Sequence, residues 1–136
     1  MPIVSDFTVI VGDENVTLGD ATPVWEKTFS TAGRHDSDAV LMLMVQHLTV
    51  ATASVDVKIN NVKIGQIFPY RYDTVAEQTE VAPHYFTQIV NIGSGILEDG
   101  DNELQLEAVK MPTSTSGNAF DDFIVRDVIC LYKQQV

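Results

Sequence analysis

Apolar and polar residues alternate in the middle of the chain on both sides of an asparagine pair. The stretch VDVKINNVKIGQI, residues 55–67, places valine and isoleucine on one face of an extended chain and Asp56 and Lys58 on the other. Asn60 and Asn61 tolerate the positive φ values that a type I′ turn requires at both central positions. This pattern predicts a half-buried β-hairpin.

Other short segments also have the pattern of strands, and turn-forming residues separate them. Residues 39–45, AVLMLMV, are apolar without alternation, which predicts a central strand buried on both faces. Residues 12–23 are expected to form a loop, and no amphipathic helix or internal repeat is visible. The remaining expected strands are residues 7–12, 24–31, 86–92, 103–108 and 123–133.

These elements predict an all-β fold, an antiparallel β-sandwich of two sheets. A chain of 136 residues fits one domain, so we expect a single sandwich over residues 1–136, with residues 1–20 as an N-terminal strand and arm.

Charge narrows the classes of partner. The chain has 19 acidic and 8 basic residues and a formal net charge of −11. Such a field repels phosphate backbones and anionic lipid surfaces, so neither nucleic-acid binding nor membrane binding is expected. No apolar run is long enough for a membrane span, and none has the form of a signal peptide. With its lone Cys130, expected to be a small buried hydrophobe, the chain fits synthesis in a reducing cytoplasm.

Catalytic motifs are missing from the sequence. His35, His47 and His84 lie far apart, and the chain contains neither a glycine-rich phosphate loop nor a nucleophile elbow. We therefore expect a protein that is not an enzyme.

Acidic loops provide candidate ligands for a hard cation. Calcium is bound by clustered oxygen atoms, and Asp36 with Asp38, or Asp121 with Asp122, could contribute them. None of these pairs has the spacing of an EF-hand, so solvated turn carboxylates are the alternative. Calcium is thus a candidate structural cofactor, and no other cofactor is expected.

Aromatic residues gather at the two ends of the long segment between residues 68 and 86. Aromatic faces stack on sugars while polar groups fix the hydroxyls, and exposed aromatics beside an arginine equally suit a protein–protein contact. Phe68 and Phe86 could instead pack beneath the segment, and Trp25 is expected to pack on the core or its rim. The candidate ligand-binding residues are Tyr70, Arg71, Tyr72, His84 and Tyr85.

Three motifs resemble galactose-binding-like β-jelly-roll domains, including the non-catalytic sugar-binding domains of glycoside hydrolases. They are Val57-Lys58-Ile59-Asn60-Asn61, Ile64-Gly65 and Gly100-Asp101-Asn102-Glu103-Leu104, and the ending DDFIVRDVICLY looks like the closing strand of that fold. The resemblance covers residues 25–132. It implies a jelly-roll topology, a role in carbohydrate binding and, as in many such domains, a structural calcium near one end of the sandwich.

Two hypotheses about function follow. The first is a non-catalytic recognition module that binds a glycan through the aromatic segment. The second is a structural subunit, decoration or adaptor of a larger assembly, such as a phage-like particle, an injection apparatus or a capsid. In that case the chain would belong to a released particle, and its N-terminal strand could pair with a neighbour or with copies of itself as a homo-oligomer. The sequence does not separate a glycan from a protein surface as the partner.

Overall fold

Nine strands in two antiparallel sheets make up the computed structural model, which describes residues 2–33, 37–48, 54–69, 84–109, 120 and 122–135. These residues contain no helix, and so none long and apolar enough to cross a membrane. The five-stranded sheet holds β1 (Ile3–Val11), β9 (Phe123–Gln135), β4 (Ala39–Gln46) and β7 (Phe86–Ile92) in that order, with β2 (Val16–Leu18) also paired to β9. The four-stranded sheet has the order β3 (Val24–Thr31), β8 (Gly100–Glu107), β5 (Val55–Ile59) and β6 (Val62–Ile67).

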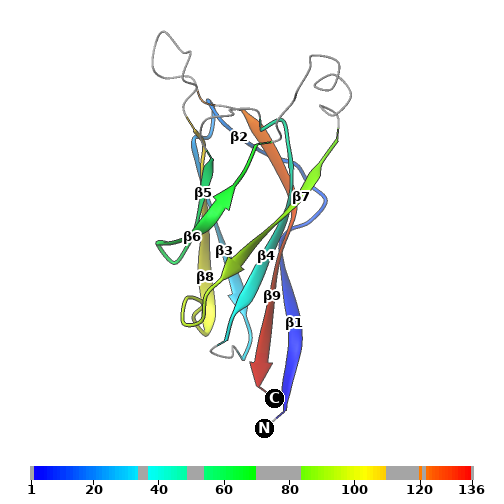
Figure 1. Ribbon diagram of the computed structural model, residues 1–136, viewed down its shortest axis with the longest axis vertical. Coiled ribbons are helices and arrows are strands. Elements are labelled where there is room, and N and C mark those ends of the chain that lie inside the picture. Colours follow the sequence, from blue (N-terminus) through cyan, green and yellow to red (C-terminus); the bar gives the residue numbers. More distant parts are fainter. Residues whose placement is uncertain are drawn as a thin grey trace.

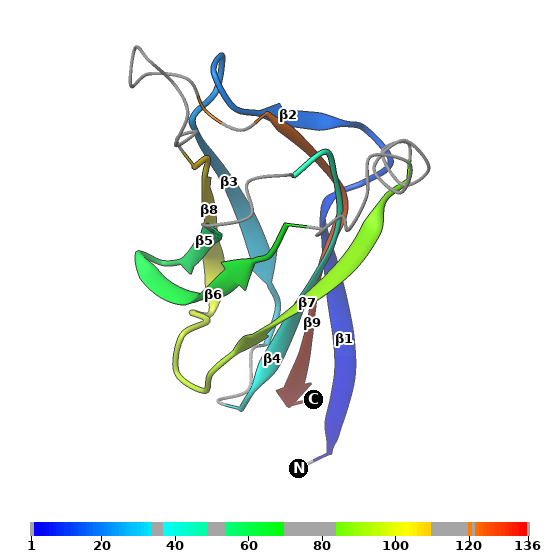
Figure 2. The same ribbon diagram turned by 45° about the horizontal axis from the view of Figure 1, so that its top comes forward.

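The two sheets stack as the layers of a sandwich, and the two ends of the chain lie together at one end of it (Figure 1). In Figure 2, β2 lies at the opposite end of the sandwich. One apolar cluster fills the space between the layers, with Leu41 and Leu43 on β4, Leu104 and Leu106 on β8 and Phe123 on β9 all fully buried. The predicted antiparallel two-sheet sandwich is confirmed.

The hairpin at the asparagine pair is confirmed as well. Asn60 and Asn61 have φ values of 52° and 65°, as a type I′ turn demands, and they join β5 to β6. The side chain of Asn60 also bonds to two other parts of the chain. Its Oδ1 accepts the backbone N–H of Glu103 at 3.0 Å, and its Nδ2 donates to the carbonyl of Ile96 at 2.9 Å.

Asn102 is the buried centre of this polar cluster. Its Oδ1 accepts the N–H of Glu98 at 2.7 Å and Nδ2 of Asn60 at 2.9 Å. Its own Nδ2 donates to Thr31 Oγ1 at 3.2 Å and to the carbonyls of Glu98 and Gly100 at 3.0 and 3.1 Å. Gly100, at φ 86°, lies in the left-handed region, which glycine adopts without strain. Asn102 satisfies polar groups that would otherwise be buried without partners.

Two expectations about individual strands were wrong. The segment expected as a loop contains β2, whose residues Val16, Thr17 and Leu18 pair with Val125, Ile124 and Phe123 of β9. The strand β4 is fully buried on one face only, because its alternate residues Val40, Met42 and Met44 remain partly exposed.

The outer surface of the five-stranded sheet is apolar. Directly paired residues on neighbouring strands share a face. Phe7, Leu131 and Val40 therefore form one apolar row, which ends at the polar Asn91 on β7, and Val9, Ile129, Met42 and Ile89 form a second row that crosses all four strands. Together with Ile3 and Met44, these residues are called the apolar face. Of nine exposed large apolar side chains among the described residues, five lie here: Ile3, Phe7, Val9, Ile89 and Leu131.

The outer surface of the four-stranded sheet is charged. The residues here called the charged face are Glu26, Asp56, Lys58, Lys63, Asp101, Glu103 and Glu107, and their positions in the paired strands put them on one side of the sheet. The ammonium of Lys63 lies 3.2 Å from a carboxylate oxygen of Asp56, which also accepts a hydrogen bond from Gln66 at 3.3 Å. This outer surface therefore consists largely of charged side chains.

Candidate functional site

The aromatic segment predicted as a binding site is described only at its two ends. Tyr70, Arg71 and Tyr72 lie outside the described residues. His84 and Tyr85 are described and stand immediately before β7, where His84 is exposed and Tyr85 is partly buried.

Phe68, at the near end of the segment, is exposed and its backbone is fixed. The residue keeps 60% of its surface open, so it is not buried, as packing beneath the segment would require. The side-chain amide of Gln88 on β7 binds both backbone groups of this residue: Oε1 accepts the N–H at 2.9 Å, and Nε2 donates to the carbonyl at 2.7 Å. These two bonds imitate a pair of strand hydrogen bonds between the end of β6 and β7. An aromatic ring is thereby presented to solvent from a backbone held at both polar groups.

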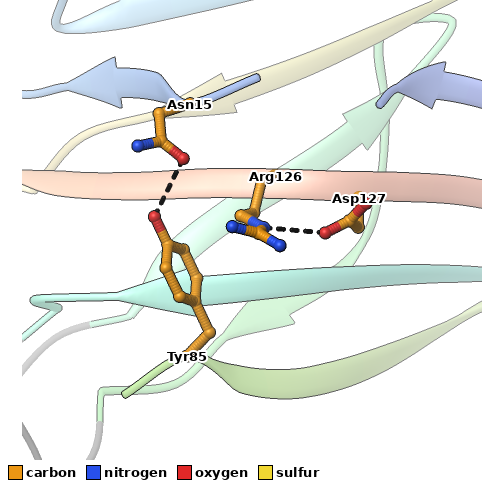
Figure 3. Close-up of polar contacts among 4 residues, drawn as sticks. All are labelled: Asn15, Tyr85, Arg126 and Asp127. Atoms are coloured by element: carbon orange, nitrogen blue, oxygen red, sulfur yellow. Dashed lines mark hydrogen bonds and ion pairs between the residues drawn. The ribbon is translucent and has the colours of Figure 1, made fainter. Parts of the chain in front are cut away.

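Tyr85, at the far end, is fixed through its side chain (Figure 3). Its hydroxyl donates to Asn15 Oδ1 at 3.0 Å, and the guanidinium carbon of Arg126 lies 5.0 Å from the centre of its ring. A cation at that distance over the ring is attracted by the π electrons. The contacts join three separate parts of the chain: the segment before β2, the start of β7 and the middle of β9. These interactions restrict the rotation of the Tyr85 ring.

Arg126 is in turn held by its neighbour Asp127. Their side chains form an ion pair, with Nε 2.8 Å from Oδ2. The hydrogen bond to Asp127 raises the pKa of Arg126 above its ordinary value, and it outweighs desolvation, which acts in the other direction. The negative charges of Asp127 and Asp13 contribute further in the same direction. The guanidinium beside Tyr85 therefore stays cationic.

An irregularity in the backbone of β9 determines where the ion pair of Arg126 and Asp127 lies. Asp127 has φ 49°, and its backbone N–H donates to the carbonyl of Gly12 at 2.8 Å. In the pairing of β9 with β4, the step from Met42 to Met44 spans three positions on β9, from Ile129 to Arg126, which is the signature of a β-bulge. As a result, Val125 and Val128 both face the core although three positions separate them.

Sequence reasoning missed Asn15, Arg126 and Asp127, and it set Phe68 aside. One signal was present, because Arg126 and Asp127 are two adjacent charged residues inside the otherwise uncharged run from Phe123 to Tyr132. Such an interruption is a mark of a bulge that redirects side chains. No comparable signal in the sequence identified Asn15.

The candidate calcium ligands that can be located bind backbone groups. Asp36 and Asp121 lie outside the described residues. Asp38 Oδ1 accepts the N–H of Ser94 at 3.0 Å, and Asp122 Oδ1 accepts the N–H of Asp20 at 2.9 Å. Within the described part of the chain, no group of three or more His, Cys, Asp or Glu side chains could hold a metal ion.

The close approach of Asp122 also explains why position 19 is a glycine. A Cβ atom at Gly19 would overlap the Asp122 carboxylate, and Gly19 has φ 142°. Asp20 Oδ1 accepts the N–H of Phe120. These bonds tie the turn after β2 to the start of β9, beside a hollow of about 420 Å³ between residues 17–22 and Asp122. Both carboxylates thus serve the local fold.

The other residues singled out in the sequence have structural positions. Cys130 is buried, and burial raises the pKa of its thiol to about 11, as expected for an unreactive core cysteine. Trp25 is partly buried and packs against the core cluster, as predicted. His47 is exposed at φ 70° immediately after β4, at the end of a strand as expected.

Comparison with known proteins identifies the fold. No family model matches the chain, and no curated protein matches its sequence. The solved structure of dimeric latent PorU from Porphyromonas gingivalis matches with a TM-score of 0.55 and 11% identity, over 99% of this chain and 13% of that chain. A family 35 carbohydrate binding module from Clostridium thermocellum matches with a TM-score of 0.54 and 7% identity, over 93% of this chain and 97% of that chain.

These matches bear out the predicted fold. A β-porphyranase of glycoside hydrolase family 86 from Bacteroides plebeius gives a lower TM-score of 0.47 at 14% identity, over 98% of this chain and 21% of that chain, and no conclusion rests on it. At such identities the likeness is one of fold. The chain shares the jelly-roll β-sandwich fold of the family 35 carbohydrate binding module, as the sequence predicted.

Proposed function

We propose that this chain is a non-catalytic recognition module that binds a glycan through aromatic side chains at the two ends of the segment between β6 and β7. One observation carries the proposal: each end presents an aromatic residue that is held in place, Phe68 by its backbone through Gln88 and Tyr85 by its ring through Asn15 and Arg126. Residues whose backbone or side chain is already ordered lose less conformational entropy on binding, which favours affinity.

The chemistry of these groups suits a sugar. An aromatic face accepts the apolar C–H side of a pyranose ring, and neighbouring donors and acceptors fix its hydroxyls. Asn15 and Arg126 are polar groups next to Tyr85, and His84 is exposed beside it. The predicted residues Tyr70, Arg71 and Tyr72 belong to the same segment and complete the proposed set. The fold shared with a carbohydrate binding module is a further argument for this class of ligand.

A glycan array probed with the purified chain, followed by calorimetric titration of the best ligand, tests the proposal. We expect Phe68→Ala, and the double change Tyr70→Ala with Tyr72→Ala, each to weaken binding at least tenfold, about 1.4 kcal/mol. Val62→Ala is the matched control, because Val62 is exposed on β6 outside the segment. Absence of binding to every glycan would contradict the proposal. Normal binding by a double tyrosine variant that unfolds several kcal/mol more easily would instead place those tyrosines in the core.

The second candidate is a structural subunit of a larger assembly. The apolar face favours it, because a contiguous exposed apolar surface marks a contact with another macromolecule.

Calcium remains a candidate structural ligand for either function. If calcium binds the folded chain preferentially, saturating calcium will raise the melting temperature above its value in excess chelator. Equal midpoints would exclude such a site.

A further inference from the structure

We infer that the apolar face of the five-stranded sheet is the interface of a symmetric dimer of this chain. The face consists mainly of two apolar rows, one over three strands and one over four, and its most exposed members lie on the edge strands. Phe7 and Val9 on β1 keep 60% and 52% of their surface open, and Ile89 on β7 keeps 67%. The middle strands contribute the less exposed Val40, Met42 and Ile129.

The extent of this face matches what a dimer requires. Its nine side chains present on the order of 500 Å² of apolar surface, at the upper end of the patches found on monomeric proteins. Each partner in an interface of standard size contributes about 800 Å², of which about 65% is apolar in homodimers. The apolar part of such an interface is therefore also about 500 Å² for each copy.

Charge explains why two acidic copies could meet here. The chain has a formal net charge of −11, so most approaches between copies are repulsive. On the strands of the apolar face the only carboxylate among the described outward positions is that of Asp127, and Arg126 pairs with it. Lys133, in register with Ser5, adds a cation at the end near the chain termini. This face thus lets copies approach without bringing unpaired carboxylates together.

The chemistry of the face disfavours a sugar as its occupant. Glycan recognition needs polar groups that fix hydroxyls, whereas the two rows contain seven apolar side chains and one polar side chain, that of Asn91 at the β7 end of the first row. Phe7 is the only aromatic residue in them. A second apolar sheet, packed at the usual spacing of about 10 Å, would bury the same side chains away from water.

Pairing of copies through the edge of β1 is less favourable than packing of the faces. A free edge strand offers unpaired backbone groups to another strand. Here Asp6 Oδ1 accepts the N–H of Phe7 at 2.8 Å, and Asp6 Oδ2 accepts Nε2 of Gln134 at 2.7 Å. The carboxylate occupies one backbone donor of β1 and adds a negative charge beside the strand. Such a charge is a common device against edge-to-edge association.

Sedimentation equilibrium of the full chain, from about 1 to 200 μM, tests the inference across the concentration range in which weak dimers form. We expect a dimer whose dissociation constant rises at least tenfold in Ile89→Asp. Val62→Asp is the matched control, because it adds the same charge at a valine that is 47% exposed on the other sheet. Circular dichroism and melting temperature establish that both variants fold. A wild-type chain that stays monomeric throughout, or equal weakening by both variants, would overturn the inference.

Cysteine cross-linking locates the interface independently of affinity. Phe7 and Ile89 lie on the two edge strands, three strand spacings of about 4.8 Å apart, which is farther than the about 10 Å between sheets packed face to face. A bifunctional thiol reagent with a reach of about 10 Å should therefore join copies of the variant with Phe7→Cys and Ile89→Cys into covalent dimers. Val62→Cys should stay monomeric, and the buried Cys130 should not react. Equal cross-linking of the Val62→Cys control would contradict an interface on this face.

Discussion

The outer surfaces of the two sheets differ although the strands beneath them are built alike. On both sheets alternate residues fill the core, but the outward positions of the four-stranded sheet carry seven charged residues, whereas those of the five-stranded sheet form two apolar rows. Core packing requires only one apolar face from each sheet. The second apolar face is therefore not a requirement of the fold, and the proposed dimer would give it a role.

The largest expected effect comes from the polar cluster inside the four-stranded sheet. Asn102→Ala removes the acceptor of the Glu98 N–H and of Asn60 Nδ2, and it leaves both donors partly buried without this partner. We expect the free energy of unfolding to fall by about 3 kcal/mol in urea denaturation. Asn91→Ala, at an exposed position of β7, is the control and should change it by less than about 0.5 kcal/mol. A loss below 1 kcal/mol for Asn102→Ala would show that water replaces these bonds.

A smaller effect is expected where a charge enters the apolar face. Ile129 lies between Val9 and Met42 in the second row and is partly buried, so Ile129→Glu should lower the free energy of unfolding by about 2 kcal/mol. The matched change Gln105→Glu falls on the other sheet between Glu26 and Lys58 and should alter it by less than about 0.5 kcal/mol. Urea denaturation at a concentration where the chain is monomeric separates this effect from dimerisation. Equal losses of unfolding free energy in Ile129→Glu and Gln105→Glu would show that the two outer faces tolerate an added charge equally well.

The smallest effect concerns an ion pair on the charged face. Burial acts to raise the pKa of Asp56, but the hydrogen bond from Gln66 and the charges of Lys63 and Lys58 outweigh it, so this pKa lies below 3.8. A lowered pKa stabilises the fold above the unfolded value and ceases to do so as pH falls through the folded value. Asp56→Asn should therefore cost about 0.5 kcal/mol at pH 7, and this cost should shrink as the pH falls through the acid range. A cost that persists at pH 2 would point to packing rather than charge.

Features that depend on a few neighbouring residues could be predicted from the sequence. The Asn60–Asn61 turn needs two residues that tolerate positive φ, and the alternation before it shows which side chains enter the core. Cys130 lies within an apolar run, so its burial also followed from local sequence. Local pattern was sufficient for these elements because their structure is largely decided within ten residues.

Features that depend on strand order could not be predicted. The three residues of β2 lie in a polar stretch, and they form a strand only because β9, more than 100 positions away, offers a free edge there. Tyr85 meets Arg126 because β4 brings β7 and β9 to its two sides. The apolar rows likewise combine residues of four strands, and no single strand shows them. None of these features could be predicted without knowing the order of the strands in the sheet.

The antiparallel pairing of β1 with β9 has a practical consequence for handling the protein. Ile3 lies opposite Gln135, so the two ends of the described chain emerge side by side, at the end of the sandwich remote from the start of β7 (Figure 1). A tether at either end would therefore hold the molecule in nearly the same orientation and point Tyr85 away from the support. Immobilisation through a terminal tag would leave the proposed sugar-binding end facing the solution, whichever end carries the tag.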